Sequence, residues 1–346
     1  MIKKILFSLF LISLVSSVSG AFYVVSNLPG TERDFSSIQS AIEHAAPYDT
    51  IYVKGSPTNY GNVLLEKPLV LIGEGFSGEI HSGHTAKLTR ILFTANPYRR
   101  TISSGSVIIG FEFPFFPGQR ANIVTVANGH TKIQDVVMER NWFWFAEIAG
   151  SAENWVFRNN IIRGWVKGGA GNGNGGAAGF HFHNNILNSL MEFQRGELTI
   201  ENNIILGRLK DISDAQVANN IFTREDYFLE EVYGSRFFNN IAMGEKIGKE
   251  DCYSNPASFE SEYLCEGSAN TGSSNRVAFD PGFVYWPSND IMGGSVFKLA
   301  QGSPARSSGR RGAEIGIFGG THPFPVNAFM NPEIDDPFPT FVTSIY

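Results

Sequence analysis

The feature that most constrains the fold is a short motif, Asn-Asn-Ile, which occurs five times in the middle of the chain, always after an alternating apolar run. The second asparagines of these motifs are Asn160, Asn185, Asn203, Asn220 and Asn240, at intervals of 25, 18, 17 and 20 residues. Asn141 occupies the same place 19 residues before the first of them. A repeat near twenty residues, with strand-like alternation and no helical period, indicates a solenoid whose units bury their apolar faces against one another.

Each repeat also predicts where its asparagine lies. In the unit at 198–203, Leu198 and Ile200 point to one side of a strand, and the polar residues that follow them point to the other. The asparagine then stands where the chain bends, a place that suits its tolerance of left-handed backbone. Stacked coils are about 4.8 Å apart, so successive amides can bond to one another. We therefore predict a buried structural ladder made of Asn141, Asn160, Asn185, Asn203, Asn220 and Asn240.

This pattern resembles the right-handed parallel β-helix of pectate-lyase-like proteins, in which such asparagine ladders line one turn. Residues 34–75 resemble the opening of that superfamily, where Asp34 or Ser36 would cap a short helix that closes the end of the solenoid. Residues 297–320 resemble the closing segment of many secreted bacterial members. The resemblance implies an all-β, single-domain, single-stranded solenoid over 21–320. It does not fix the function, because the superfamily hosts lyases, hydrolases, epimerases, adhesins and proteins without known activity.

The two ends of the chain lack the repeat. Lys3 and Lys4 precede an apolar stretch at 5–18 and the small residues at 19–21, which is typical of a signal peptide at 1–20. We expect a secreted, cell-surface or periplasmic protein without a membrane span in the mature chain; a retained N-terminal anchor is the alternative. Residues 321–346 form a Pro- and Phe-rich tail, expected to pack along the outside or to reach toward a partner.

The net charge disfavours one class of partner, and the two cysteines predict a disulfide. The formal net charge of −6 becomes −8 without Lys3 and Lys4, which disfavours nucleic acid as a partner. Cys252 and Cys265 are the only cysteines, and in an exported protein they are expected to form one local disulfide, with two free thiols as the alternative. We expect a monomer.

Four carboxylates are predicted to share one outer face. Ile148, Phe193, Ile212 and Val232 are taken to point inward, so the residue before each points outward. These outward residues are Glu147, Glu192, Asp211 and Glu231, with Lys167 in the intervening coil. Glu192, Asp211 and Glu231 would lie on consecutive coils, about 5 Å apart. A charged strand face that merely meets solvent is the alternative.

Several chemistries fit such a row. Glu192, Asp211 and Glu231 could bind calcium, the only cofactor that the sequence suggests. Two of them could instead act as an acid and a base in glycosidic cleavage. In a calcium-assisted lyase, Lys167, Lys210, Arg195 or Arg208 would be the base that removes a proton from a uronate.

Substrate contacts are predicted beside the row. An outward Trp144 or Trp142 could stack on a sugar ring, although core packing is the alternative for both. With Glu147, Arg195 and Arg208, Trp144 is expected to contact substrate. A Gly-rich segment at 167–179 would be a groove wall or a surface insertion. The predicted function is binding of an acidic or neutral polysaccharide in an acidic outer groove. Cleavage of that polysaccharide by lyase or hydrolase chemistry is left open. The alternative is a non-catalytic, adhesive surface solenoid.

Overall fold

The computed structural model describes residues 20–75, 84–96, 101–118, 121–126, 132–148, 152–169, 177–194, 197–244, 263–264, 269–284 and 297–324. Residues 1–19 of the predicted signal segment, both cysteines and residues 325–346 of the predicted tail lie outside these ranges. The signal peptide and the disulfide therefore stay predictions. Within the described ranges, no helix is long and apolar enough to cross a membrane.

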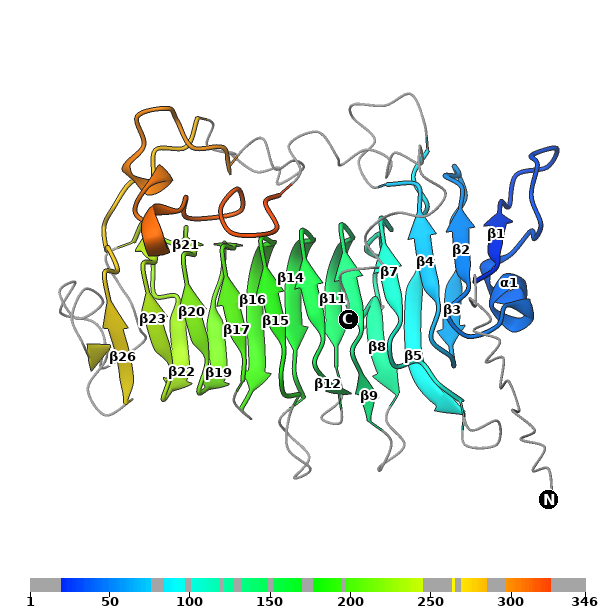
Figure 1. Cartoon of the computed structure of the whole chain (residues 1–346), viewed down its shortest axis with the longest axis horizontal. Coiled ribbons are helices and arrows are strands. Elements are labelled where there is room, and N and C mark those ends of the chain that lie inside the picture. Colours follow the sequence, from blue (N-terminus) through cyan, green and yellow to red (C-terminus); the bar gives the residue numbers. More distant parts are fainter. Residues whose placement is uncertain are drawn as a thin grey trace, which may run out of the picture.

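The strands stack into two long sheets along one axis, so that the chain is a parallel β-helix (Figure 1). The first sheet contains, in spatial order, β1 (Phe22–Val25), β2 (Thr50–Val53), β4 (Val70–Gly73), β7 (Val107–Ile109), β10 (Val137–Glu139), β13 (Val156–Arg158), β15 (His181–His183), β17 (Thr199–Glu201), β20 (Gln216–Ala218), β23 (Arg236–Phe238), β26 (Asn270–Ser273) and β25 (Tyr263–Leu264). Only the pairing of β25 with β26 is antiparallel among the described strands of this sheet.

The second sheet faces the first across the core. It contains β3 (Asn62–Leu65), β5 (Arg90–Asn96), β8 (Ile123–Val126), β11 (Trp142–Glu147), β14 (Ile161–Lys167), β16 (Ile186–Phe193), β18 (Ile204–Ile205), β19 (Leu209–Ser213), β21 (Ile221–Phe222), β22 (Leu229–Tyr233) and β24 (Ile241–Ala242). The long strand β16 pairs with both β18 and β19, because the next coil bends between these two. Short strands β6 (Thr101–Ile102), β9 (Ile133–Gln134) and β12 (Ala152–Glu153) lie at the margins. The predicted all-β solenoid is confirmed.

A short helix covers the first coil, as predicted. Helix α1 (Ile38–His44) lies beside β1 at one end of the solenoid (Figure 1), with Ile38, Ala41 and Ile42 buried against the core. Its N-cap is Ser37, whose side chain accepts a hydrogen bond from the Ser40 N–H. The predicted caps, Asp34 and Ser36, were wrong: the Asp34 carboxylate instead accepts from the Val24 N–H at 2.7 Å.

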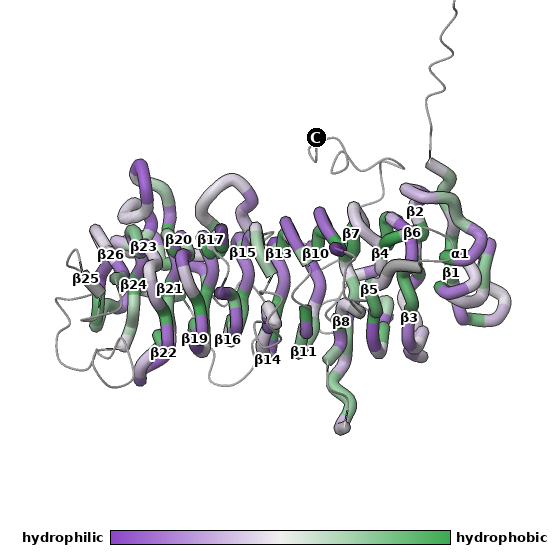
Figure 2. The backbone as a smooth tube through the Cα atoms, turned by 90° about the horizontal axis from the view of Figure 1, so that it is seen from below, coloured by the Kyte–Doolittle hydropathy of each residue, from purple (hydrophilic) through white to green (hydrophobic). Residues whose placement is uncertain are grey.

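The core is a column of apolar side chains stacked coil on coil. Hydrophobic and hydrophilic stretches alternate within the coils (Figure 2), and the apolar residues of the strands are the ones that are buried. Phe157 and Phe182, on adjacent coils, have ring centroids 4.9 Å apart and stack in parallel. Trp155 and Phe180 stack in the same way at 6.1 Å. All four rings are fully buried, so each coil contributes to its neighbours' stability and has little stability alone.

The asparagine ladder is present, and its six predicted members are completely buried. The Oδ1 of Asn203 accepts hydrogen bonds from the N–H and the Nδ2 of Asn185, at 2.8 and 3.0 Å. Asn203 Nδ2 in turn donates to the Phe182 carbonyl at 2.8 Å. The same arrangement recurs along the ladder, which extends one rung further than predicted, to Asn275.

The first asparagine of each pair has a different role. It adopts a left-handed backbone, with φ between +53° and +57° at Asn159, Asn184, Asn202, Asn219 and Asn239. The left-handed backbone predicted for the ladder asparagines is therefore wrong, since none of them has a positive φ. The two asparagines of each pair therefore have different roles at the corner. The first residue turns the chain, and the second forms the buried hydrogen bonds of the ladder.

The outward asparagines also hold the C-terminal segment, residues 303–324, against the solenoid. Asn184 Nδ2 donates to the carbonyls of Ile317 and Gly319, at 2.8 and 2.7 Å. Asn239 Nδ2 donates to the Ser308 carbonyl at 3.0 Å. The segment therefore runs along the asparagine corner across several coils, and it brings its own side chains to the margin of the first sheet.

Replacing Asn203 with alanine is expected to lower the free energy of unfolding by about 3 kcal/mol or more, because several buried donors and acceptors lose their partner. Chemical denaturation of the purified protein measures this loss. Asn202→Gly is the matched control, since Asn202 lies outside the ladder and glycine accepts its positive φ. The control should lose less than about 1 kcal/mol. Equal losses in the two variants would contradict the proposed division of roles.

Candidate functional site

In the strands that were predicted to carry the acidic row, the residues predicted to point inward do so. Ile148, Phe193, Ile212 and Val232 are all buried in the core. The residue before each faces outward, on the second sheet. The row itself is shorter than predicted, as the pairing of the strands shows.

Three of the four carboxylates lie on consecutive coils. Lys210 pairs with Glu230 and Ile212 with Val232, which places Asp211 beside Glu231. On the other side, Phe193 pairs with Ile212, which places Glu192 beside Asp211.

Glu147 does not belong to this row, and here the prediction was wrong. It pairs with Lys167, which in turn pairs with Met191, one residue before Glu192. The offset arises because Glu192, Asp211 and Glu231 have positive φ values of 62°, 52° and 55°. Each of these three residues is an extra outward position in its strand, and simple alternation does not predict it.

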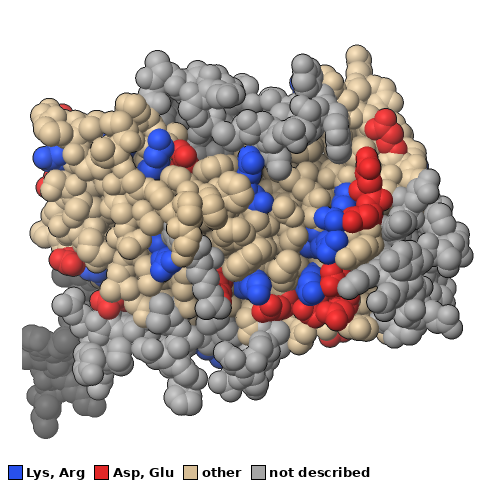
Figure 3. Space-filling model, turned by 180° about the vertical axis from the view of Figure 1, so that it is seen from behind, with Lys and Arg blue, Asp and Glu red and all other residues tan. Residues whose placement is uncertain are grey.

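Basic residues beside this row and a further carboxylate, Glu230, make the surface a band of mixed charge. We call it the charged band, and it comprises Glu192, Asp211, Glu230, Glu231, Lys167, Lys210 and Arg208. Lys167 Nζ lies 2.9 Å from Glu192 Oε1. Lys210 Nζ lies 2.7 Å from Glu230 Oε1, and Arg208 Nη1 lies 3.3 Å from Glu230 Oε2. Figure 3 shows blue and red side chains intermixed toward one end of this face. The surface is therefore less acidic than the sequence alone suggested.

Asp211 is the residue of the band with the most altered acidity. Partial burial raises its pKa to about 6, and a hydrogen bond with Glu231 and the charge of Glu231 add to the rise. Lys210 opposes the shift, and Glu192 adds slightly to it. The hydrogen bond with Glu230 raises the pKa of Lys210, so this lysine stays charged. Asp211 can thus take or give a proton near pH 6, beside a fixed cation.

An aromatic platform adjoins the charged band. It consists of Phe115, Trp144, Phe145 and Trp165. Trp144 and Phe145 both lie outside the core, since each is only partly buried while Phe143 and Ala146 on either side are fully buried. The pairing of β11 with β14 is irregular here, because β14 has one extra residue before Trp165. Phe145 then lies 5.0 Å from Trp165, ring centroid to ring centroid. The predicted outward Trp144 therefore lies on the surface with other rings around it.

Two local features shape the platform. A side chain at Gly164 would collide with the Phe145 ring, since its Cβ would lie 2.2 Å from Phe145 Cε1. Lys167 connects the platform to the band, because its Nζ lies 5.2 Å from the Trp165 ring centroid and also contacts Glu192. Sequence reasoning missed Trp165 and Phe115. The glycine before Trp165 was the available signal, since strands tolerate glycine where another group approaches closely.

The remaining predicted site residues have different outcomes. Arg208 contacts the band and stacks on Tyr227, with its guanidinium carbon 4.0 Å from the ring centroid. Arg195 and residues 170–176 of the Gly-rich segment lie outside the described ranges. In the described part of the chain, no three His, Cys, Asp or Glu side chains converge to hold a metal ion. Glu192, Asp211 and Glu231 are not such a group, and calcium binding by them stays a prediction.

Three histidines meet on the outside of the first sheet. The rings of His181 and His183, on β15, stack with centroids 5.7 Å apart, and His322 of the C-terminal segment lies 6.4 Å from His183. Burial lowers the pKa of His183 to about 4, and the neighbouring histidines and Arg158 lower it further. Burial also lowers the pKa values of His181 and His322, so at neutral pH the three rings are uncharged.

No family model matches the chain, and no curated protein matches its sequence. The structure is similar to that of the deglycosylated pectin methylesterase from Aspergillus niger, with 12% identity and a TM-score of 0.40 over 77% of this chain and 88% of that chain. The same enzyme in a penultimately deglycosylated form matches with 12% identity and a TM-score of 0.39 over the same shares. A pectin methylesterase mutant in complex with a hexasaccharide matches with 9% identity and a TM-score of 0.22, over 82% and 94%. At such identities these similarities concern the fold alone, and the secreted bacterial type stays a prediction.

Glu231→Gln is expected to return the pKa of Asp211 toward its ordinary range, because the amide removes a negative charge and can donate to the ionised carboxylate. Titration of the side-chain carboxyl carbons by NMR measures the change. Glu192→Gln, which removes only a weaker charge effect, should give a smaller fall in the pKa of Asp211.

Folding raises the pKa of Asp211, so the stability of the wild type should decrease as pH rises from about 4 to 6. Glu231→Gln should reduce that decrease. An unchanged Asp211 titration would contradict the pairing.

Stability should also depend on His183. Its pKa is lowered by folding, so the unfolded chain binds the proton more tightly and stability falls as pH drops from 6.5 toward 4. For this group alone the loss between pH 7 and 5 is about 2 kcal/mol. His183→Gln should flatten the pH dependence of denaturant unfolding by that amount, whereas His84→Gln, at an exposed position, should keep the wild-type slope. A wild-type slope in His183→Gln would refute this account.

Proposed function

We propose that the protein binds a polysaccharide along the outer face of the second sheet, over the aromatic platform and the charged band. The observation that carries this proposal is their continuity through Lys167, which lies against Trp165 and pairs with Glu192. Aromatic faces suit the C–H faces of sugar rings, and charged groups beside them suit hydroxyls and carboxylates. A solenoid repeats such positions along its axis, which suits an extended polymer.

The partial exposure of the platform supports the same conclusion. Phe115 keeps 48% of its surface exposed and packs against Trp144. The Arg163 guanidinium also contacts Trp144, at 5.2 Å from its ring centroid. Clustered rings at a surface leave apolar area in water, which is unfavourable unless a ligand covers it. An exported location, as the sequence predicts, would bring this face to extracellular polysaccharides.

A second candidate function is cleavage of a uronate polymer by a lyase step. Two-carboxylate glycoside hydrolysis requires carboxyl groups about 5 Å or more apart. Asp211 and Glu231 are neighbours on adjacent coils about 4.8 Å apart, at the lower limit of that spacing, so the lyase step is the better candidate. In the lyase step, ionised Asp211 takes the proton beside the uronate carboxylate while Lys210 neutralises that carboxylate. A carbon–carbon double bond then forms as the glycosidic carbon–oxygen bond breaks, and the departing oxygen takes a proton from water.

Trp144→Ala is expected to weaken polysaccharide binding roughly tenfold, because one stacking surface of the platform is lost. Affinity electrophoresis or calorimetry on a panel of neutral and uronate-rich polysaccharides measures the change. Tyr48→Ala removes an exposed ring elsewhere on the molecule and should bind like the wild type. If the wild type binds nothing on the panel, the non-catalytic surface solenoid becomes the better account.

The lyase step has its own readout. The wild type should release an unsaturated, ultraviolet-absorbing product, and Asp211→Asn should no longer form this product although it still binds the polysaccharide.

A further inference from the structure

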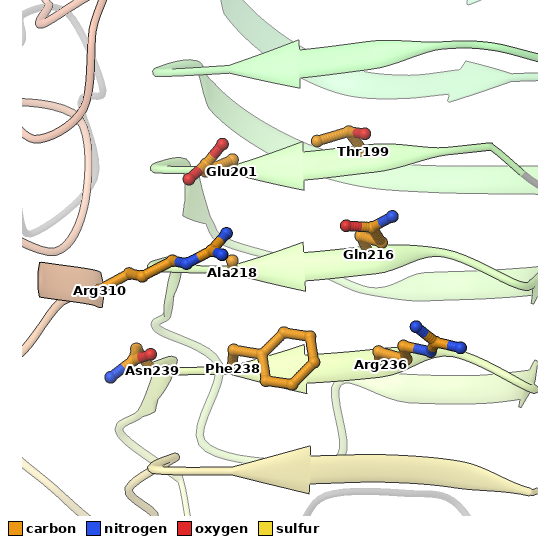
Figure 4. Close-up of a pocket in the computed structure, with 8 residues that line it drawn as sticks. All are labelled: Thr199, Glu201, Gln216, Ala218, Arg236, Phe238, Asn239 and Arg310. Carbon is orange, nitrogen blue, oxygen red and sulfur yellow. The ribbon is translucent and has the colours of Figure 1, made fainter.

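A hollow lies on the opposite side of the solenoid, over the first sheet. It is a cavity of about 330 Å³ bounded by β17, β20 and β23 and by the C-terminal segment (Figure 4). Thr199, Gln216 and Arg236 form one row across the three strands, and Glu201, Ala218 and Phe238 form the next. Ala218 has the smallest side chain of the six, and the hollow exists because nothing larger stands between Glu201 and Phe238.

The C-terminal segment closes one side of this cavity with Arg310. The 3-10 helix η4 (Arg310–Gly312) begins at this residue, and the Arg310 N–H donates to the Asn219 Oδ1 at 3.0 Å. The Gly316 N–H donates to the Asn219 carbonyl at 2.8 Å, which holds the segment on the same coil. The arginine side chain extends from there across the sheet toward the hollow (Figure 4). Its position is thus fixed by the asparagine corner and does not depend on a free loop.

The cavity carries more positive than negative charge. Arg236 and Arg310 line it together with one carboxylate, Glu201. Among the residues that the structure describes, neither guanidinium forms an ion pair or a side-chain hydrogen bond. Two guanidinium groups without internal partners at one hollow are available for an anion, and their fork geometry suits a carboxylate.

The other lining groups suit a sugar ring. The Phe238 ring provides an apolar face at the edge of the hollow (Figure 4). Thr199, Gln216 and Glu201 provide a hydroxyl, an amide and a carboxylate, which bind sugar hydroxyls as donors and acceptors. We propose that this cavity is a second ligand site, distinct from the second-sheet surface, which binds one acidic sugar unit through its carboxylate.

The test isolates this site from the surface proposed above. All titrations use the full-length Trp144→Ala protein, so that the aromatic platform contributes little, and the probe is a trimer of a hexuronate. Calorimetry is expected to detect binding of the trimer, with roughly tenfold or greater weakening in Arg310→Gln, since a charge-assisted contact is lost. Arg311→Gln is the matched control, because it removes the same charge at the next residue, outside the cavity. It should change binding by no more than about twofold.

Two further comparisons make the result decisive. Ala218→Leu fills the hollow without changing charge and should weaken binding at least as much as Arg310→Gln does, while its unfolding midpoint reports whether the fold is retained. The methyl-esterified trimer should bind as weakly as the free trimer binds to Arg310→Gln. The proposal is overturned if the trimer does not bind, if Arg310→Gln and Arg311→Gln weaken binding equally, or if acetate competes as well as the trimer does.

Discussion

The hydrogen bonds of the asparagine ladder are the constraint on which the rest of this structure depends. After Asn141, each ladder Oδ1 accepts two hydrogen bonds from the preceding asparagine, and each Nδ2 donates to a backbone carbonyl, so a buried corner is satisfied without water. Because the coils from Asn141 to Asn275 repeat this corner, the strands after it begin in the same register. The side chains on the outside of both sheets therefore align in rows across the coils. The charged band and the first-sheet cavity are both built from such rows.

The doubled asparagine explains how the C-terminal segment contributes to the outer surface. The first residue of each pair needs a left-handed backbone, which asparagine tolerates, and its side chain is then directed away from the core. Asn184, Asn219 and Asn239 use these amides to hold a segment that is 69 to 135 residues distant in sequence. That segment positions Arg310 and His322 against the first sheet. A motif that repeats for reasons of internal hydrogen bonding thus also determines what the outside presents.

The sequence predicts those features that repeat and misses those that occur once or depend on distant contacts. The period located six ladder residues and the inward face of the acidic strands, because both follow from local alternation. Asn275 was missed because a serine precedes it in place of an asparagine. The offset of Glu147 was missed because it depends on left-handed residues inside strands, such as Asp211. An acidic residue type does not indicate that conformation. The first-sheet cavity could not be predicted, since Arg310 reaches it only through the docking of the C-terminal segment.

Inward and outward residues of a solenoid are subject to different physical constraints. Inward residues must fill a narrow column, so Phe157, Phe182 and their neighbours are constrained by every adjacent coil. Outward residues meet solvent, and replacing one of them leaves the ladder and the core unchanged. A parallel β-helix can therefore retain its coils while either face acquires a different set of side chains, so the arrangement of its strands does not determine its chemistry. The function of this chain must be argued from the rows that are not required for folding, namely the rings beside Lys167 and the arginines around Ala218.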